Sequence, residues 1–291
     1  MAFKYSLSLL ALVSGALAQN CPLQFDGRMP GGTTPASFDS KKTSLFDPGN
    51  VFGKNLTWSK IITLPTNLTS SLFDHCGQPP LSLSLTDSSI FAPSATNIQL
   101  GFRRAELLPS SNNGSDASTT GIKTLHFSIQ KDLAHPLNFS HEYQLVFLET
   151  ADFSDNQFVL KTGTILGSNG TAATGERLVV VGNINDGAKE LFSTPWTEGW
   201  HNFGVVLDFD RNTTQILHST ALSPLTNVTS PLPNNISGRG QYHFGMLKKP
   251  TDTPSGGDIT KSGFQEAGIN ERVVYGGIFM EESERGCVSL S

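Results

Sequence analysis

The chain has 291 residues and carries 20 Lys and Arg against 25 Asp and Glu, a formal net charge of −5. This mildly acidic balance, without any basic run, argues against nucleic acid and anionic membrane as partners. The hydrophobic share of 37% comes close to the usual globular value once the 28 glycines are added, so the chain can bury a core, and its length suits one large all-β domain or two small ones.

The N-terminus has the layout of a secretion signal. Lys4 supplies a positive charge, an apolar run extends from Leu7 to Leu17, and Ala16-Leu17-Ala18 has the small-residue pattern that signal peptidase requires. The run is too short to cross ~30 Å of hydrocarbon, and no later stretch approaches the ~20 apolar residues that a membrane span needs. We therefore expect residues 1–18 to be a signal peptide, a mature chain that begins at Gln19, and a secreted, extracellular protein.

Eight Asn-x-Ser/Thr motifs agree with passage through a glycosylating secretory pathway. Any single motif of this kind arises often by chance, but this many suits a glycoprotein whose occupied sites lie on exposed loops or strands. The motifs are at Asn55, Asn67, Asn113, Asn138, Asn169, Asn212, Asn227 and Asn235.

Three cysteines lie in the expected mature region. Cys21 and Cys287 stand almost at its two ends, and the termini of a domain usually lie close together at the surface. We predict a Cys21–Cys287 disulfide, which leaves Cys76 unpaired and available for burial in the core. No Cys/His spacing is typical of a structural zinc site, so no metal is expected.

Strand patterns dominate the rest of the chain. The segment Leu81–Leu85 alternates Leu and Ser, which is typical of a half-buried strand, and no segment shows a sustained helical period with caps. Similar short patterns, separated by clusters of Gly, Asn, Asp, Pro and Ser, predict strands at Ile98–Leu107, Lys123–Gln130, Glu142–Glu149, Gln157–Thr162, Arg177–Val181, Phe203–Phe209, Gln215–Ser219, Gln241–Leu247 and Arg272–Phe279. The predicted fold class is all-β, a β-jelly roll or two-sheet antiparallel sandwich with long loops.

The strand patterns keep the same character throughout, so we expect residues 19–291 to form a single domain. Gly31–Lys54 and Pro250–Ile269 are predicted to be long loops, but neither has the length or the monotony of an interdomain linker. A boundary near Ser111–Thr120 is the alternative, although the patterns on its two sides are alike.

A first candidate site lies in the segment Gly101–Pro109. On a strand, Arg104 and Glu106 share one face and Arg103 points the other way. An arginine two residues from a glutamate can orient the carboxylate and hold it ionised. A surface ion pair on a solvated sheet face would produce the same pattern and is the more frequent case.

A second candidate opens the strand predicted at Glu142–Glu149. Glu142 and Gln144 share a face there, while His141 and Tyr143 occupy the opposite one. A carboxylate beside an amide suits a sugar, whose hydroxyls both donate and accept hydrogen bonds. An exposed carboxylate at a strand end is the plainer interpretation.

Aromatic and histidine residues mark two further segments. Trp196 and Trp200 stand just before His201, and such indole rings either carry pyranose rings or anchor a core at a sheet corner. Farther on, Gln241 and His243 face one side of a predicted strand, while the aromatic residues between and after them face the other. A lone histidine in a strand is usually structural.

Other chemistries lack their motifs. The chain has no Gly-x-Ser-x-Gly elbow, no His-Glu-x-x-His and no phosphate-binding loop, and Cys76 has only His75 as an electropositive neighbour. What remains is a set of carboxylates on an extracellular β scaffold. That combination is compatible with glycoside hydrolysis, in which one carboxyl protonates the leaving oxygen and another activates water or attacks.

At these segments the chain resembles glycoside hydrolase family 131, secreted fungal β-glucanases with a β-jelly-roll catalytic domain. The matching stretches follow one another across nearly the whole mature chain. They are Cys21-Pro22-Leu23-Gln24-Phe25-Asp26-Gly27-Arg28, Gly101-Phe102-Arg103-Arg104-Ala105-Glu106-Leu107, His141-Glu142-Tyr143, Trp200-His201-Asn202-Phe203, Tyr242-His243-Phe244-Gly245 and Tyr275-Gly276-Gly277-Ile278-Phe279.

The resemblance implies hydrolysis of β-1,3-, β-1,6- and β-1,4-linked glucans with inversion and without a metal or other cofactor. Carried over by motif, Glu106 and Glu142 are expected to be the catalytic acid and base, in an order left open, with carboxyls ~6.5–9.5 Å apart. Either neighbouring arginine could separate their pKa values. The residues expected to bind substrate or tune these carboxylates are Arg103, Arg104, Gln144, His201, Gln241 and His243. The expected partner is a β-glucan polysaccharide or oligosaccharide, and the protein is expected to be a monomer.

Two other functions fit the same scaffold. A lectin-like module would bind glucan without releasing product. A polysaccharide lyase is the other alternative, because jelly rolls also host β-elimination at uronic acids. Arg103, Arg104, His141 and Tyr143 are the residues that would suit a lyase.

Overall fold

The computed structural model describes residues 21–111, 116–166 and 175–291. The expected signal peptide, its cleavage point before Gln19, and the Asn113 and Asn169 motifs lie outside the described residues. Within the described ranges no helix is long and apolar enough to cross a membrane.

The described residues form short strands joined by long loops, with one single-turn helix, α1 (Trp58–Ile61), and two 3₁₀ turns, Pro35–Asp39 and Ala117–Thr119. The strands are β1 (Leu23–Asp26), β2 (Ile62–Thr63), β3 (Leu81–Thr86), β4 (Arg103–Leu107), β5 (Ile122–Lys131), β6 (Glu142–Glu149), β7 (Asn156–Gly163), β8 (Arg177–Val181), β9 (Glu190–Pro195), β10 (His201–Asp208), β11 (Thr213–Thr220), β12 (Thr226–Asn227), β13 (Leu232–Pro233), β14 (Gln241–Lys248) and β15 (Asn270–Glu282).

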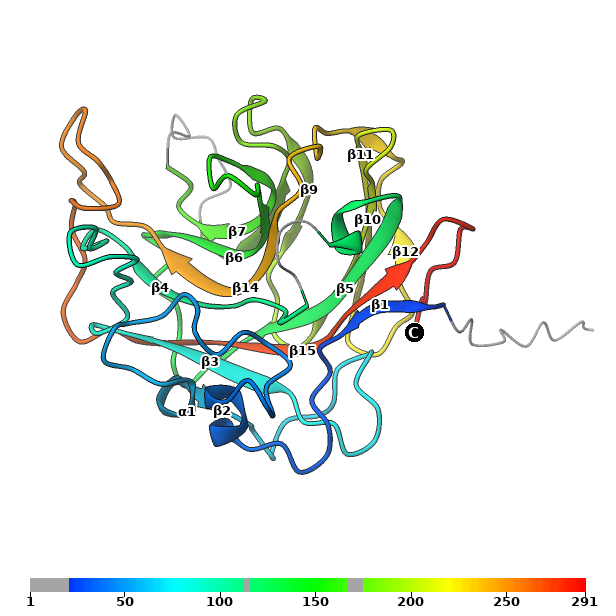
Figure 1. Cartoon of the computed structure of the whole chain (residues 1–291), viewed down its shortest axis with the longest axis horizontal. Helices are drawn as coiled ribbons and strands as arrows, with labels where there is room; N and C mark the ends of the chain where they lie inside the picture. Colours follow the sequence, from blue (N-terminus) through cyan, green and yellow to red (C-terminus); the bar gives the residue numbers. More distant parts are fainter. Residues whose placement is uncertain (1–20, 112–115, 167–174) are drawn as a thin grey trace, which may run out of the picture.

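Two antiparallel sheets lie face to face (Figure 1). The large sheet has the order β12-β11-β10-β5-β15-β3-β2, with β1 beside β15 and β13 beside β11. The small sheet has the order β4-β14-β6-β7-β8-β9. The predicted all-β, two-sheet architecture is confirmed.

Most predicted strands occur within one to three residues of their predicted bounds, and β6 and β8 match at both ends. The strand predicted at Ile98–Leu107 was wrong in its first half. Residues 98–101 turn, because Gln99 N donates to Phe91 O and Gly101 N to Thr260 O, and the strand begins only at Arg103. Five strands were missed: β1 with four residues, the edge strand β9, which ends in a proline, and the two-residue strands β2, β12 and β13.

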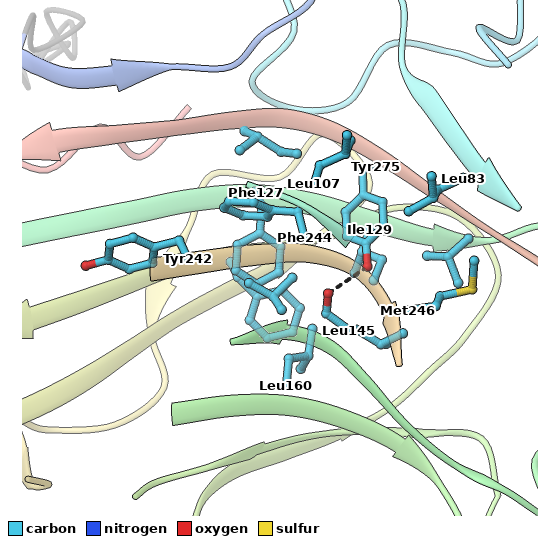
Figure 2. Packing of buried hydrophobic residues seen from close by; sticks show 14 of the residues in the cluster. Leu83, Leu107, Phe127, Ile129, Leu145, Leu160, Tyr242, Phe244, Met246 and Tyr275 are labelled. Carbon is cyan, nitrogen blue, oxygen red and sulfur yellow. Dashed lines mark hydrogen bonds between the residues drawn. The ribbon is translucent and has the colours of Figure 1, made fainter. Parts of the chain in front are cut away.

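Period-two alternation turns one face of each strand into a shared apolar core. On β14, Tyr242, Phe244 and Met246 point inward, and the ring of Phe244 meets Phe127 of β5 edge to face at 6.4 Å (Figure 2). Core residues come from both sheets, so the inward side of β14 is fixed by packing. Gln241 and His243 lie on the outward side of β14 and do not belong to this core.

All three tryptophans belong to the core, which decides between the two interpretations of Trp196 and Trp200. Trp58, Trp196 and Trp200 are all at most 4% exposed. Trp58 packs against Phe52 with ring centroids 4.6 Å apart. None of the three offers a face to a sugar.

The predicted disulfide is confirmed, with the Cα atoms of Cys21 and Cys287 5.6 Å apart. It joins the start of β1 to the C-terminal segment, which lie side by side in Figure 1. The burial considered for Cys76 was wrong, since this thiol is free and exposed. In its loop Phe73, not Cys76, packs onto the large sheet, against Phe279.

Removing the disulfide should destabilise the protein strongly. The bond joins cysteines 266 positions apart in the sequence, and closing so long a loop restricts the unfolded chain. We expect the Cys21→Ser, Cys287→Ser double variant to lose about 2–5 kcal/mol of unfolding free energy in chemical denaturation. Cys76→Ser is the matched control and should unfold like the wild type. Equal stability of all three proteins would contradict this role of the bond.

Candidate active site

The outer face of the small sheet carries a buried ion pair. Ala105 and Leu107 of β4 lie in the core, so Arg104 and Glu106 project from the opposite face. Arg104 Nε lies 2.7 Å from Glu106 Oε1 and Nη2 lies 2.8 Å from Oε2, a bidentate contact. The Glu106 side chain is 0% exposed, and the remaining Arg104 nitrogen, Nη1, donates to Gln99 Oε1 at 3.1 Å.

His243 of β14 connects this pair to a second carboxylate. Its Nδ1 lies 2.8 Å from Glu106 Oε2, and its Nε2 lies 3.3 Å from Glu149 Oε2 at the end of β6. The imidazole stacks on Phe147, with ring centroids 4.3 Å apart. One imidazole therefore contacts carboxylates from two strands, with Glu106 at one ring nitrogen and Glu149 at the other.

The electrostatics of the cluster favour charged groups. Burial alone would raise the pKa of Glu106, but Arg104 and His243 outweigh it, and the pKa is lowered. Burial alone would lower the pKa of His243, but its contacts with Glu106 and Glu149 outweigh that effect, and the pKa is raised. Glu106 therefore stays ionised to a lower pH, and His243 stays protonated to a higher pH, than either side chain would alone in water.

Glu149 was missed by the sequence analysis because of a β-bulge. Counting by twos from Glu142 places Glu149 on the core face. In the structure, the register of β6 shifts between Gln144 and Val146, and Leu145 and Val146 both lie in the core. The phase of alternation therefore reverses, and Glu149 returns to the outer face. The sequence signal of this reversal is the unbroken apolar run Leu145-Val146-Phe147-Leu148, in which the alternation is lost.

Tyr275 of β15 holds the strands together at this irregularity. Its hydroxyl reaches across the core to Leu145 O at 3.0 Å (Figure 2) and to Gly245 O at 2.6 Å, so one proton is shared between carbonyls of β6 and β14. Gly245 is required there, since a Cβ atom would lie 2.1 Å from Ala105 O. The large sheet thus fixes the bulge that orients Glu149.

Glu142, the other predicted catalytic residue, lies at the opposite end of β6 in a separate cluster. Its Oε1 lies 3.0 Å from Lys161 Nζ and 2.7 Å from Lys249 Nζ, and its Oε2 accepts from Leu166 N at 2.7 Å. Burial would raise its pKa, but the two lysines lower it. No described contact joins Glu142 to Glu106.

The predicted binding residues divide between two locations. Gln241 is half-buried and pairs with Glu149 in the β14–β6 ladder, beside the cluster. Gln144 lies on the same outer face, where its Oε1 accepts from Asn156 Nδ2 at 3.2 Å. The structure thus brings Arg104, Gln241 and His243 together with Glu106, and places Gln144 on the same face.

Arg103 and His201 lie elsewhere. The Arg103 guanidinium folds back and donates to the carbonyls of Leu100 and Phe102, both at 2.9 Å. His201 lies on the large sheet, where Nδ1 is 3.2 Å from His218 Nε2, and burial lowers its pKa to about 4. Neither side chain contacts the cluster around Glu106 within the described part of the chain.

A stabilising role for His243 predicts a pH dependence. Its folded pKa lies above the ordinary 6.5, so the contribution is complete below that pH and is lost as pH rises through the folded pKa. Chemical denaturation at several pH values should show wild-type stability falling on the alkaline side, and His243→Gln should lack this loss. The same dependence of unfolding free energy on pH in both proteins would contradict a stabilising role for His243.

Two buried phenols offer a matched comparison for the bulge. Tyr275→Phe and Tyr242→Phe each remove a buried hydroxyl, the latter bonded to Ser118 O at 2.9 Å, and each should cost ~1–3 kcal/mol. Only Tyr275→Phe should bring the pKa of His243, followed by NMR titration, closer to its ordinary value, because only it releases the bulge that orients Glu149. The same His243 pKa in both variants would show that the bulge does not depend on Tyr275.

The pattern of the family described as glycoside hydrolase 131 catalytic N-terminal domain matches residues 23–286. The chain is similar to the crystal structure of a GH131 β-glucanase catalytic domain from Podospora anserina, with 22% identity, a TM-score of 0.71, and coverage of 92% of this chain and 98% of that one. It is also similar to the catalytic domain of the glycoside hydrolase family 131 protein from Coprinopsis cinerea, with 21% identity, a TM-score of 0.66, and coverage of 93% and 97%. Comparison with curated proteins gave no match. The two structures establish the shared fold, and the family match over most of the chain establishes that this protein belongs to glycoside hydrolase family 131.

Proposed function

We propose that the protein hydrolyses β-glucans at the outer face of the small sheet, with Glu106, His243 and Glu149 as the reacting cluster. Family membership supports glycoside hydrolysis, and the Podospora relative is described as a β-glucanase. The single observation that carries the assignment is the His243 bridge between two carboxylates, 2.8 Å from one and 3.3 Å from the other.

The environments of the two carboxylates suggest different roles. Glu149 is the accessible one, with 21% of its side chain exposed, and we assign it as the acid that protonates the leaving oxygen. The proposed source of the proton that restores this acid is imidazolium His243, whose Nε2 lies 3.3 Å from Glu149 Oε2. Glu106 is held ionised by Arg104 and His243, which suits a base. Its three hydrogen bonds leave one of about four acceptor positions for a water.

This assignment replaces Glu142 by Glu149 as the partner of Glu106. The ion pairs of Glu142 with Lys161 and Lys249 fit a structural role in joining β6 to β7 and to the end of β14. The pair Glu106 and Glu142 stays a prediction that experiment can decide. Inversion remains part of the proposal, and it requires that a water activated by the base attacks the sugar directly.

The substrate and setting are proposed on further grounds. A glucan chain with β-1,3, β-1,6 or β-1,4 linkages is the proposed partner, with Gln241 and Gln144 as hydrogen-bonding groups on the same face. The Cys21–Cys287 disulfide supports an extracellular, secreted protein, because such bonds persist in oxidising compartments.

The lyase alternative is disfavoured by two side chains. The hydroxyl of Tyr143 is buried and donates to Glu271 at 2.9 Å. His141 contacts Glu266 at 2.8 Å and the carbonyl of Lys249 at 2.7 Å. Neither group is available to take a proton from a uronic acid.

Three glutamine substitutions test the assignment on laminarin and cello-oligosaccharides. Glu106→Gln and Glu149→Gln should each lower kcat by about 10²–10⁴-fold, because each removes a proton-transfer group. Glu142→Gln is the control, since it alters another buried glutamate on the same face, and it should retain most activity while lowering the unfolding midpoint. Product release is measured by chromatography, and the anomer by NMR.

An inactive Glu142→Gln beside an active Glu149→Gln would restore Glu142 as the second catalytic residue. Binding without hydrolysis by the wild type would favour the lectin-like alternative. A product that absorbs in the ultraviolet would favour the lyase.

A further inference from the structure

The turn that follows Glu149 is tightly closed. Thr150 N donates to Asp155 O at 2.8 Å and Phe153 N donates to Thr150 O at 3.0 Å. Inside the turn, Asp152 Oδ1 accepts from Thr150 Oγ1 at 2.7 Å and from Ser154 Oγ at 2.6 Å. The β6–β7 turn therefore has a defined shape, set by its own hydrogen bonds.

Phe153 occupies an unfavourable position in this turn. Its φ is 59°, in the left-handed region, which costs a residue with a Cβ roughly 1–2 kcal/mol. Its side chain is also exposed, at 67%. A bulky aromatic residue is an outlier at such a φ, where Gly or Asn is usual, and neither feature favours folding. Strain of this kind concentrates at ligand-binding sites.

A second strained residue lies on the adjoining loop, before β14. Arg239 has a φ of 53° and is exposed. The two loops are tied together, since Ala151 N donates to Gly238 O at 3.1 Å. The next residue, Gly240, passes so close that a Cβ would lie 1.7 Å from Glu149 O. Arg239 is therefore held directly beside the strand end that carries Glu149.

The two loops that carry these exposed side chains thus adjoin the Glu149–Gln241 pair, which joins the ends of β6 and β14. A phenyl ring can pack against the C–H face of a pyranose, and a planar guanidinium can donate several hydrogen bonds to hydroxyls. We propose that Phe153 and Arg239 form a sugar-binding subsite that holds a glucan unit next to Glu149. This inference rests on the proposed function, which it extends by one subsite.

Replacing Phe153 by Gly or Asn tests the subsite, since both residues tolerate the left-handed backbone. We expect both variants to unfold at a higher temperature than the wild type, while KM for laminarin rises about threefold to tenfold and kcat stays within about twofold. Arg239→Asn should raise KM in the same way.

Ala221→Gly is the matched control. Ala221 has a φ of 54° and lies just after β11 of the large sheet, so this change relieves the same backbone strain away from Glu149. It should raise the unfolding temperature and leave KM unchanged. Affinity electrophoresis in laminarin gels gives a second readout that needs no turnover.

The outcomes separate the two proposals. An unchanged KM and unchanged gel retardation in the Phe153 variants of a protein that hydrolyses laminarin would overturn the subsite alone. A lower unfolding temperature in both variants would assign Phe153 to packing and also overturn it. If the wild type binds laminarin without hydrolysis, the proposed function fails and gel retardation decides on the subsite. If the wild type does neither, both proposals fail.

Discussion

The bidentate pair between Arg104 and Glu106 constrains much of the small sheet. Charges this deeply buried are unfavourable unless each is paired and hydrogen-bonded. The pair alone leaves one acceptor position open on each Glu106 oxygen, and His243 fills the position on Oε2 from the neighbouring strand. β4 and β14 must therefore align in one register, with Glu106 opposite Gly245. The local geometry of both strands follows from the need to surround one carboxylate with donors.

The bulge extends this constraint to a third strand. Without it, β6 would present Val146 and Leu148 to the outer face and bury Glu149 in the core. The reversal depends on a tyrosine from the other sheet, whose hydroxyl bonds carbonyls on both β6 and β14. The core between the sheets is thus more than apolar filling, because one of its polar contacts determines which side chains reach the outer face.

The features that could be predicted from the residues alone are mostly those that local periodicity determines. It predicted the sheet class, the bounds of β6 and β8, the terminal disulfide, and the shared face of Arg104 and Glu106. It missed Glu149, because a single extra residue inverts every later position of a strand and is fixed by contacts distant in sequence. It also considered Cys76 for the core, although the neighbouring Phe73 fills that role. Which exposed groups gather around a site is decided by how strands pair, and pairing is not a local property.

The bond between Cys21 and Cys287 makes the described fold a covalent ring, apart from the few residues after Cys287. A linear chain cut by a protease in an exposed loop becomes two separable pieces. Here one cut, for example within the loop of residues 250–269, leaves a single molecule whose ends at the cut remain held by the surrounding sheets. Two cuts are needed before any segment between the cysteines can leave. Such a molecule can keep its shape after damage that would dismantle an open chain.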